Sequence, residues 1–141
     1  MTTTINADTS VGGAIVTGDT SGQLGLQADG TTLLTVAGDA VTFNKGISET
    51  IYNLSGTALD PANGTIQTKT LSTGVTLSDS LSSGESLVLM LNGGVTHSVI
   101  FPPMTWVTGS GNAAPTLTAN DTIVFWKIST TLYGAYVGSY T

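Results

Sequence analysis

The sequence contains no cysteine and few charged residues, and these two absences narrow what the chain can be. Without cysteine there is no disulfide framework and no thiolate metal site. Charged residues make up 9 % of the 141 residues, whereas an ordinary soluble domain has about 25 %. Only Lys45, Lys69 and Lys127 are basic, and the formal net charge is −6. Because phosphate contacts need clustered basic residues, we expect no nucleic-acid binding and no binding to an anionic membrane.

Long apolar runs are missing as well. The longest, at 86–91 and 122–126, are far shorter than the roughly 20 residues that a membrane-spanning helix needs. No positively charged start precedes an apolar core, so we expect no secretion signal. The sequence is instead rich in Thr, Ser, Gly and aliphatic residues. A surface made of such residues resists association with other chains only weakly. The composition therefore favours a protein that works inside an assembly.

The apolar pattern is that of strands. Short alternating or apolar segments recur at intervals of about 8–12 residues, separated by Gly and Asn turns. We predict an all-β fold, an antiparallel β-sandwich or jelly-roll-like domain preceded by an extended arm and a hairpin. A single helical turn at 48–54 competes with a strand there, because Ile51 and Tyr52 favour strand. The predicted parts are an extended N-terminal arm at 1–21, a β-hairpin module with its connection at 22–63, and a C-terminal β-sandwich domain at 64–141.

The segment 24–43 alternates between apolar and polar residues and breaks at Asp29-Gly30 and again at Gly38-Asp39. A three-residue loop at 28–30, with Gly30 in the left-handed conformation, gathers the apolar residues on one face. A two-residue turn would mix the faces, so we predict the longer loop, with Leu33 as the one misfit. The apolar face needs a partner surface, and we predict that it is buried between chains. It consists of Leu24, Leu26, Leu34 and Val36.

His97 is the only histidine, and its place follows from the turn signal Asn92-Gly93-Gly94. This signal predicts a hairpin in which 95–101 returns against 85–91, with His97 opposite Leu89. A histidine on that apolar face is a packed residue that donates to a backbone carbonyl, or it lies at a subunit interface. A catalytic base is the weakest alternative, because no nucleophile or orienting group is near it in the sequence.

The acids recur at intervals that resemble a repeat. Six of them follow one another every ten or eleven residues: Asp8, Asp19, Asp29, Asp39, Glu49 and Asp60. Most are in Gly- or Pro-containing turns, where Asp bonds to nearby backbone N–H groups, and turn chemistry explains them better than calcium. Asp79 and Glu85 carry no signal of a glycosidase pair. We therefore predict no metal site, no cofactor and no enzymatic activity.

Aromatic residues concentrate in the C-terminal half, at Trp106, Trp126, Tyr133, Tyr136 and Tyr140. They are typical of core and interface anchors, and a sugar-binding platform is the alternative. We predict a short edge strand at 104–107 that carries Trp106, and a closing hairpin of 122–128 and 132–137. The complete set of predicted interface residues is Leu24, Leu26, Leu34, Val36, His97 and Trp106.

Two stretches carry a family resemblance. The segment TSGQLGLQADGTTLLTV at 20–36, and the C-terminal run that includes FPPMTWVTGSGNAAPTL, resemble tailed-phage virion structural proteins of the capsid decoration (cement) or fibre-like kind. The resemblance implies a trimeric all-β protein without enzymatic activity, made in the host bacterial cytoplasm. No long shaft repeats separate the two stretches, which favours a decoration protein that binds the major capsid protein on the capsid surface. The alternatives are a short tail fibre or receptor-binding tip and, third, a glycan-active enzyme.

Overall fold

The computed structural model describes residues 23–108 and 111–141, and the all-β prediction is confirmed. The predicted arm at 1–21 lies outside the described residues. No helix in the described part of the chain is long and apolar enough to cross a membrane. In chain order the elements are β1 (Gln23–Ala28), β2 (Thr31–Ala37), β3 (Ala40–Phe43), β4 (Ile51–Asn53), β5 (Ala58–Leu59), the 3-10 turn η1 (Pro61–Asn63), β6 (Ile66–Thr70), β7 (Val75–Thr76), β8 (Ser78–Asp79), β9 (Ser86–Asn92), β10 (Val99–Ile100), β11 (Thr105–Trp106), β12 (Asn120–Ile128) and β13 (Thr131–Ser139).

The chain divides into two units between Ser48 and Glu49. The sequence placed the division at Gly64, but residues 49–63 supply β4, β5 and η1 to the C-terminal unit. There β4 pairs with β6 and β5 pairs with β8, both in parallel. Ile51 and Tyr52 form a strand, so the helical turn considered for 48–54 is not present.

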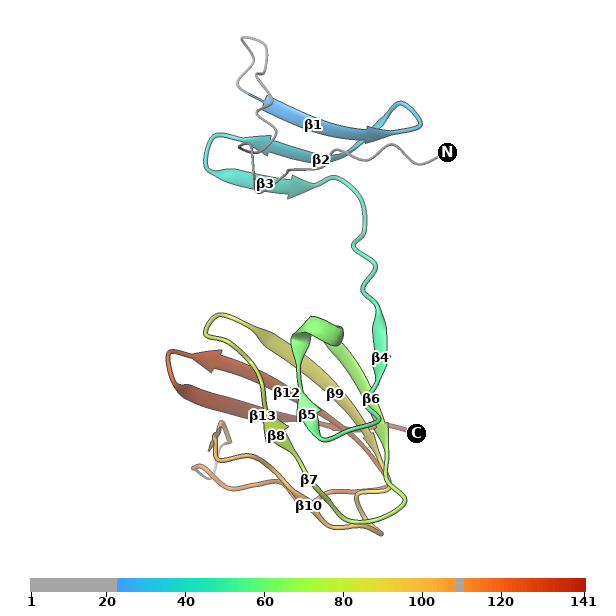
Figure 1. The fold of residues 1–141 in the computed structure, drawn as a ribbon, viewed down its shortest axis with the longest axis vertical. Coiled ribbons are helices and arrows are strands. Elements are labelled where there is room, and N and C mark those ends of the chain that lie inside the picture. The colour runs from blue at the N-terminus through green and yellow to red at the C-terminus, as the bar shows by residue number, and fades with distance from the viewer. Residues whose placement is uncertain (1–22, 109–110) are drawn as a thin grey trace, which may run out of the picture. The chain divides into compact units, whose positions relative to one another are not determined.

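The N-terminal unit contains an antiparallel sheet in the order β1-β2-β3 (Figure 1). Its first turn corrects the predicted loop length. Ala28 pairs with Thr31, so the turn has two residues, and both Asp29 (φ 51°) and Gly30 (φ 68°) are left-handed. These angles are typical of a type I′ turn, whose twist suits a hairpin.

A β-bulge at Leu33 explains why the predicted apolar face is nevertheless correct, although Thr32 and not Thr31 pairs with Gln27 on the polar face. Gln27 pairs with Thr32, whereas the next pair along β1 is Leu26 with Leu34, so Leu33 is an extra residue on β2. The extra residue resets the alternation that a two-residue turn would otherwise have shifted. The misfit residue of the sequence pattern is therefore the bulge itself.

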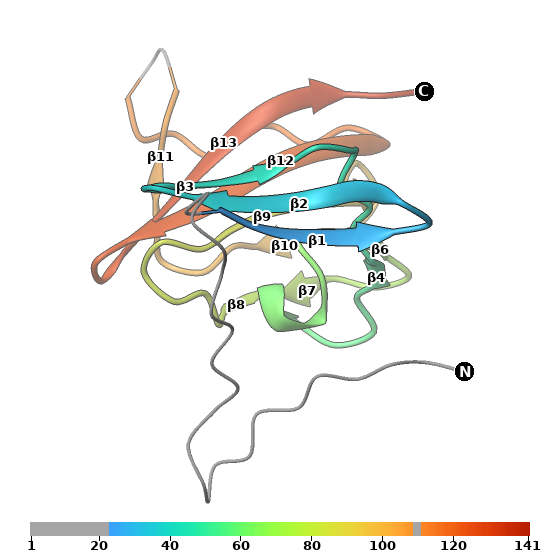
Figure 2. The same cartoon turned by 90° about the horizontal axis from the view of Figure 1, so that it is seen from above.

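The C-terminal unit is built around a six-stranded sheet in the order β11-β13-β12-β9-β6-β4. The expected closing hairpin is present as β12 and β13, and β9 is central, between β12 and β6. The sheet is mixed and not purely antiparallel, because β4–β6, β6–β9 and β11–β13 are parallel pairs. Figures 1 and 2 show the short strands β7, β8 and β10 gathered on one side of this sheet.

The hairpin predicted at Asn92-Gly93-Gly94 is wrong. After β9 the chain turns away from the sheet, with the Gly93 N–H donating to the Ala119 carbonyl (2.6 Å) and the Gly93 carbonyl accepting from His97 N (3.0 Å). The returning strand β10 pairs in parallel with β7, not with β9. Both edges of β9 are already occupied by β12 and β6, so no position was left for the predicted partner.

The core of the C-terminal unit lies between the large sheet and the short strands. Leu87 pairs with Phe125 and Leu89 with Ile123 on neighbouring strands, so all four side chains point to one face. All are buried, at 0–1 % exposure. The remaining buried apolar residues are Leu54, Leu59, Leu71, Leu77, Leu81, Leu91, Trp106 and Leu132.

Candidate interaction surface

One face of the β1–β2–β3 sheet is apolar and open. Cross-strand pairing places Leu24 beside Val36 and Leu26 beside Leu34, and β3 continues both rows. We call this set the β1–β3 apolar face; it comprises Leu24, Leu26, Leu34, Val36, Val41 and Phe43. Leu26, Val41 and Phe43 are 51–56 % exposed. Contiguous exposed apolar side chains of this kind are typical of interaction surfaces.

The opposite face of the same sheet is polar. Thr35 pairs with Thr42, and the Asn44 amide donates to Thr35 Oγ1 (2.9 Å). Gln27 Nε2 donates to Thr32 Oγ1 (3.1 Å). The sheet is therefore two-sided, with hydrogen-bonded polar residues on one side and aliphatic and aromatic residues on the other.

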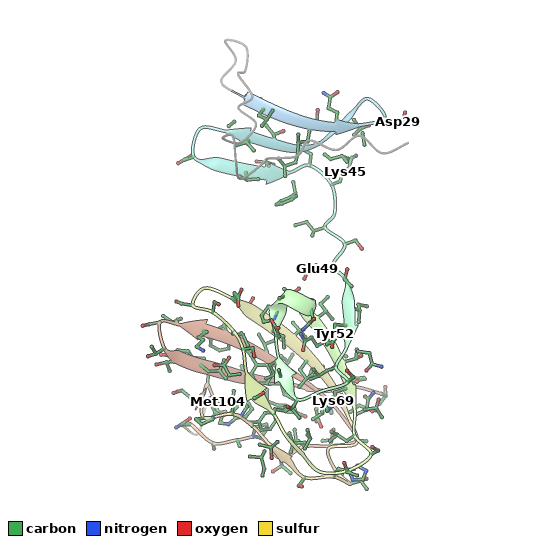
Figure 3. The ribbon with its side chains drawn as sticks, viewed as in Figure 1. Asp29, Lys45, Glu49, Tyr52, Lys69 and Met104 are labelled. Carbon is green, nitrogen blue, oxygen red and sulfur yellow. The ribbon has the colours of Figure 1, made fainter. Side chains whose placement is uncertain are left out.

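A hollow of about 410 Å³ opens at one end of the apolar face. Leu26, Leu33, Leu34, Phe43 and Ile47 line it together with Gly46, and Lys45 is the one charged residue in the lining. Figure 3 shows Lys45 just beyond β3, and Asp29 at the turn between β1 and β2. The bulge residue Leu33 thus contributes to the hollow, although its side chain fits neither face of the regular pattern.

The large sheet has a second apolar face, on the side away from the core. There Val88 pairs with Val124, and the Trp126 ring stacks on Tyr133 with centroids 5.7 Å apart and planes 11° apart. These four side chains are half-buried, and the alternate positions of β9 and β12 on this face carry no charge. Residues 87–91 are apolar at every position, which is the sequence signal of a strand covered on both faces.

The two remaining predicted interface residues belong to the C-terminal unit. Trp106 is 7 % exposed and meets Phe101 edge to face, with centroids 5.0 Å apart. His97 is half-buried, and its backbone N–H donates to the Gly93 carbonyl. Leu24, Leu26 and their partners thus belong to one sheet of the N-terminal unit, whereas Trp106 and His97 belong to the C-terminal unit. An interface role for these residues stays a prediction.

Three of the acids that the structure describes, Asp60, Glu85 and Asp79, serve local structure. Asp60 Oδ1 accepts from Ala62 N (3.0 Å) and caps η1, and Glu85 Oε2 accepts from Ser82 N (2.6 Å). Asp79 forms an ion pair with Lys127. Asp8 and Asp19 lie outside the described residues, and within residues 23–108 and 111–141 no three His, Asp or Glu side chains converge as metal ligands.

The most buried carboxylate, Asp121, is fully enclosed at 0 % exposure. It accepts from Thr118 N (2.8 Å), from Thr118 Oγ1 (2.8 Å) and from the Tyr136 hydroxyl (2.9 Å). Burial and the neighbouring Asp121 carboxylate raise the pKa of the Tyr136 phenol above 10.0. This network joins the loop that precedes β12 to β13. We infer that it stabilises the C-terminal unit.

No family model matches the sequence, and no curated protein and no solved structure was found to be similar. The apolar faces are therefore interpreted from their own chemistry. Neither offers a nucleophile, an acid–base pair or a set of metal ligands, and what they offer chemically is area for protein contact.

Proposed function

We propose that this chain is a structural protein of a tailed-phage virion, which decorates the capsid as a homotrimer and binds the major capsid protein. The observation that carries the proposal is the β1–β3 apolar face, an ordered sheet with one side left open. The low charge of the chain and its resemblance to virion proteins support the same function. The role is mechanical, and no reaction is involved.

The physical basis is burial of apolar area. At about 25 cal/mol per Å², a standard interface of about 1,600 Å² supplies enough free energy for a specific contact after the cost of ordering is subtracted. A contact repeated around a shell adds up to a reinforcement against internal pressure. The uncharged outer face of the large sheet, around Val88 and Val124, offers a second surface for contact between copies.

Location and copy number in the virion test the proposal. Quantitative mass spectrometry of purified virions, scaled to the major capsid protein, together with immunogold labelling, separates the alternatives. Hundreds of copies on the shell support decoration. A few copies at the tail would overturn it in favour of the short tail fibre or receptor-binding tip.

Charge introduced on the apolar face tests the surface itself. We expect Leu26→Asp to abolish binding to capsids that lack the protein, because an aspartate cannot be buried there without a partner. Thr42→Asp adds the same charge to the opposite, polar face of the same sheet and is the matched control. Equal capsid binding by the two variants would contradict the assignment of this face.

A further inference from the structure

The C-terminal unit contains a polar cleft of about 500 Å³ that the proposed function does not use. It lies between the segment that follows β4 and the segment that follows β6. Its lining is formed by Asn53, Leu54, Ser55, Gly56, Thr57, Lys69, Thr70, Leu71, Ser72, Thr73, Gly74 and Val75. The volume is within the range of about 300–1,000 Å³ that is usual for small-molecule sites.

Lys69 supplies the only charge in this lining. Its Nζ donates to the Leu54 carbonyl (3.1 Å) and to the Gly56 carbonyl (2.8 Å), which accounts for two of the three N–H groups of an ammonium. Neutral carbonyls hold the group in place but do not cancel its charge. Within residues 23–108 and 111–141, Lys127 forms an ion pair with Asp79, and Lys69 forms none.

The lining of this cleft contains no acidic residue. Nine acids and three basic residues give the protein a net charge of −6, yet the twelve lining residues include one lysine and no Asp or Glu. Lys69 is therefore the one formal charge among the lining residues, and it is positive. An anionic group that enters it gains a charge-assisted hydrogen bond and meets no carboxylate in the lining.

The rest of the lining suits a hydroxylated ligand. Ser55, Thr57, Ser72 and Thr73 present hydroxyl groups and Asn53 an amide, all of which both donate and accept, as sugar hydroxyls do. Val75, which is half-buried, adds apolar surface for the C–H groups of a ring. A single ammonium matches the single charge of a carboxylate better than the double charge of a phosphate monoester.

We propose that this cleft binds an acidic saccharide, with the sugar carboxylate on Lys69 and the ring hydroxyls on the surrounding Ser, Thr and Asn side chains. Lys69 lies on β6 in the C-terminal unit (Figure 3), whereas the proposed capsid-binding surface belongs to β1–β3. The two proposals use different residues, so either can fail without the other. Together they describe a virion protein that holds the shell with one unit and a surface glycan with the other.

The experiment titrates the full-length ¹⁵N-labelled chain with digalacturonic acid and, in parallel, with the neutral disaccharide galactobiose. We expect amide shifts confined to residues 53–57 and 69–75. We also expect a Kd at least about tenfold lower for the acid than for the neutral sugar, as a charge-assisted hydrogen bond implies. No shift at up to about 50 mM digalacturonic acid, a concentration far above the millimolar Kd of weak complexes, overturns the proposal. Shifts centred elsewhere, or equal binding of the two sugars, overturn it too.

Two variants locate the site. Lys69→Met is expected to raise the Kd for digalacturonic acid at least about tenfold, whereas Lys45→Met, the same change in the other unit, leaves it unaltered. Because Lys69 also holds the β4–β5 turn, its replacement can disturb the fold. Thr73→Trp keeps the lysine and its hydrogen bonds but fills the cleft from an exposed position, and it is expected to abolish binding. Unchanged affinity in Thr73→Trp, or in a natively folded Lys69→Met, would refute the assignment.

Discussion

Lys127 donates to Asp79 across 2.6 Å, and this ion pair joins β12 of the large sheet to β8 of a two-stranded sheet. The two side chains are only 20 % and 18 % exposed, so water screens the pair incompletely. Asp79 Oδ1 also accepts from Leu81 N (2.9 Å), which fixes the carboxylate. The pair therefore links the two layers that enclose the core.

We expect Lys127→Met to lower the free energy of unfolding by about 1–3 kcal/mol, because it leaves the Asp79 carboxylate half-buried without its counter-charge. Urea denaturation of the full chain measures the change. Lys45→Met, which removes an exposed lysine from the N-terminal unit, is the matched control and should change stability by less than about 0.5 kcal/mol. Equal losses in the two variants would show that the ion pair contributes nothing.

The Tyr136–Asp121 contact predicts a dependence on alkaline pH. The raised pKa of Tyr136 means that the folded chain holds the phenol proton more tightly than the unfolded chain does. The resulting stabilisation is complete below the unfolded value of 10.0 and is lost as the pH rises through the folded pKa. We expect Tyr136→Phe to be less stable than wild type near pH 9, and the difference to shrink as the pH rises above 10.0. Denaturation curves across this range test the expectation, and a constant difference would contradict it.

The Asp29-Gly30 turn predicts a specific glycine requirement. Gly30 has φ 68°, where an added Cβ costs about 1 kcal/mol from strain alone, since nothing lies within 4 Å of it. We expect Gly30→Ala to speed amide hydrogen exchange in β1 and β2 by about fivefold, in keeping with that cost. Gly46→Ala, at a glycine that is not left-handed and is equally open, should leave exchange unaltered. If the two variants exchange alike, the turn is not of the type I′ kind.

The burial of Trp106 predicts that its replacement lowers stability far more than replacement of its exposed neighbour Val107 does. Its side chain is 7 % exposed and packs on Phe101, so Trp106→Ala should cost about 3–5 kcal/mol in the free energy of unfolding. Val107→Ala, at the neighbouring position that is 52 % exposed, should cost less than about 1 kcal/mol. An interface role for Trp106 would show the opposite result, with a change in the mass of the assembly measured by light scattering and little loss of stability.

The apolar face of β1–β2 was predictable because period-two alternation is a local property of the chain. Leu24, Leu26, Leu34 and Val36 share that face as the alternation implied. The turn length was not predictable in the same way. A three-residue loop and a two-residue turn followed by a bulge give the same apolar face. They differ in the backbone angles of Asp29 and Gly30 and in whether Gln27 pairs with Thr31 or with Thr32.

The neighbours of β9 were not predictable from local pattern. Asn92-Gly93-Gly94 has the residues of a hairpin, but β6 and β12 occupy the two edges of β9 from far away in sequence. Parallel pairs such as β6–β9 leave no turn signal, since their connection is long. The cleft around Lys69 could not be predicted for a similar reason, because residues 53–57 and 69–75 form its lining and are separated in the sequence.

The long-range pairings of β9 with β12 and of β11 with β13 have a consequence for the folding of the chain. Trp106 lies beside Gly134, and β9 completes its pairing only when β12, some thirty residues later, is present. During synthesis the apolar strand β9 therefore has one edge unpaired until β12 has emerged. Distant pairings of this kind fold slowly and leave strand edges open to aggregation meanwhile. The yield of native protein therefore depends on the emergence of β12 and β13.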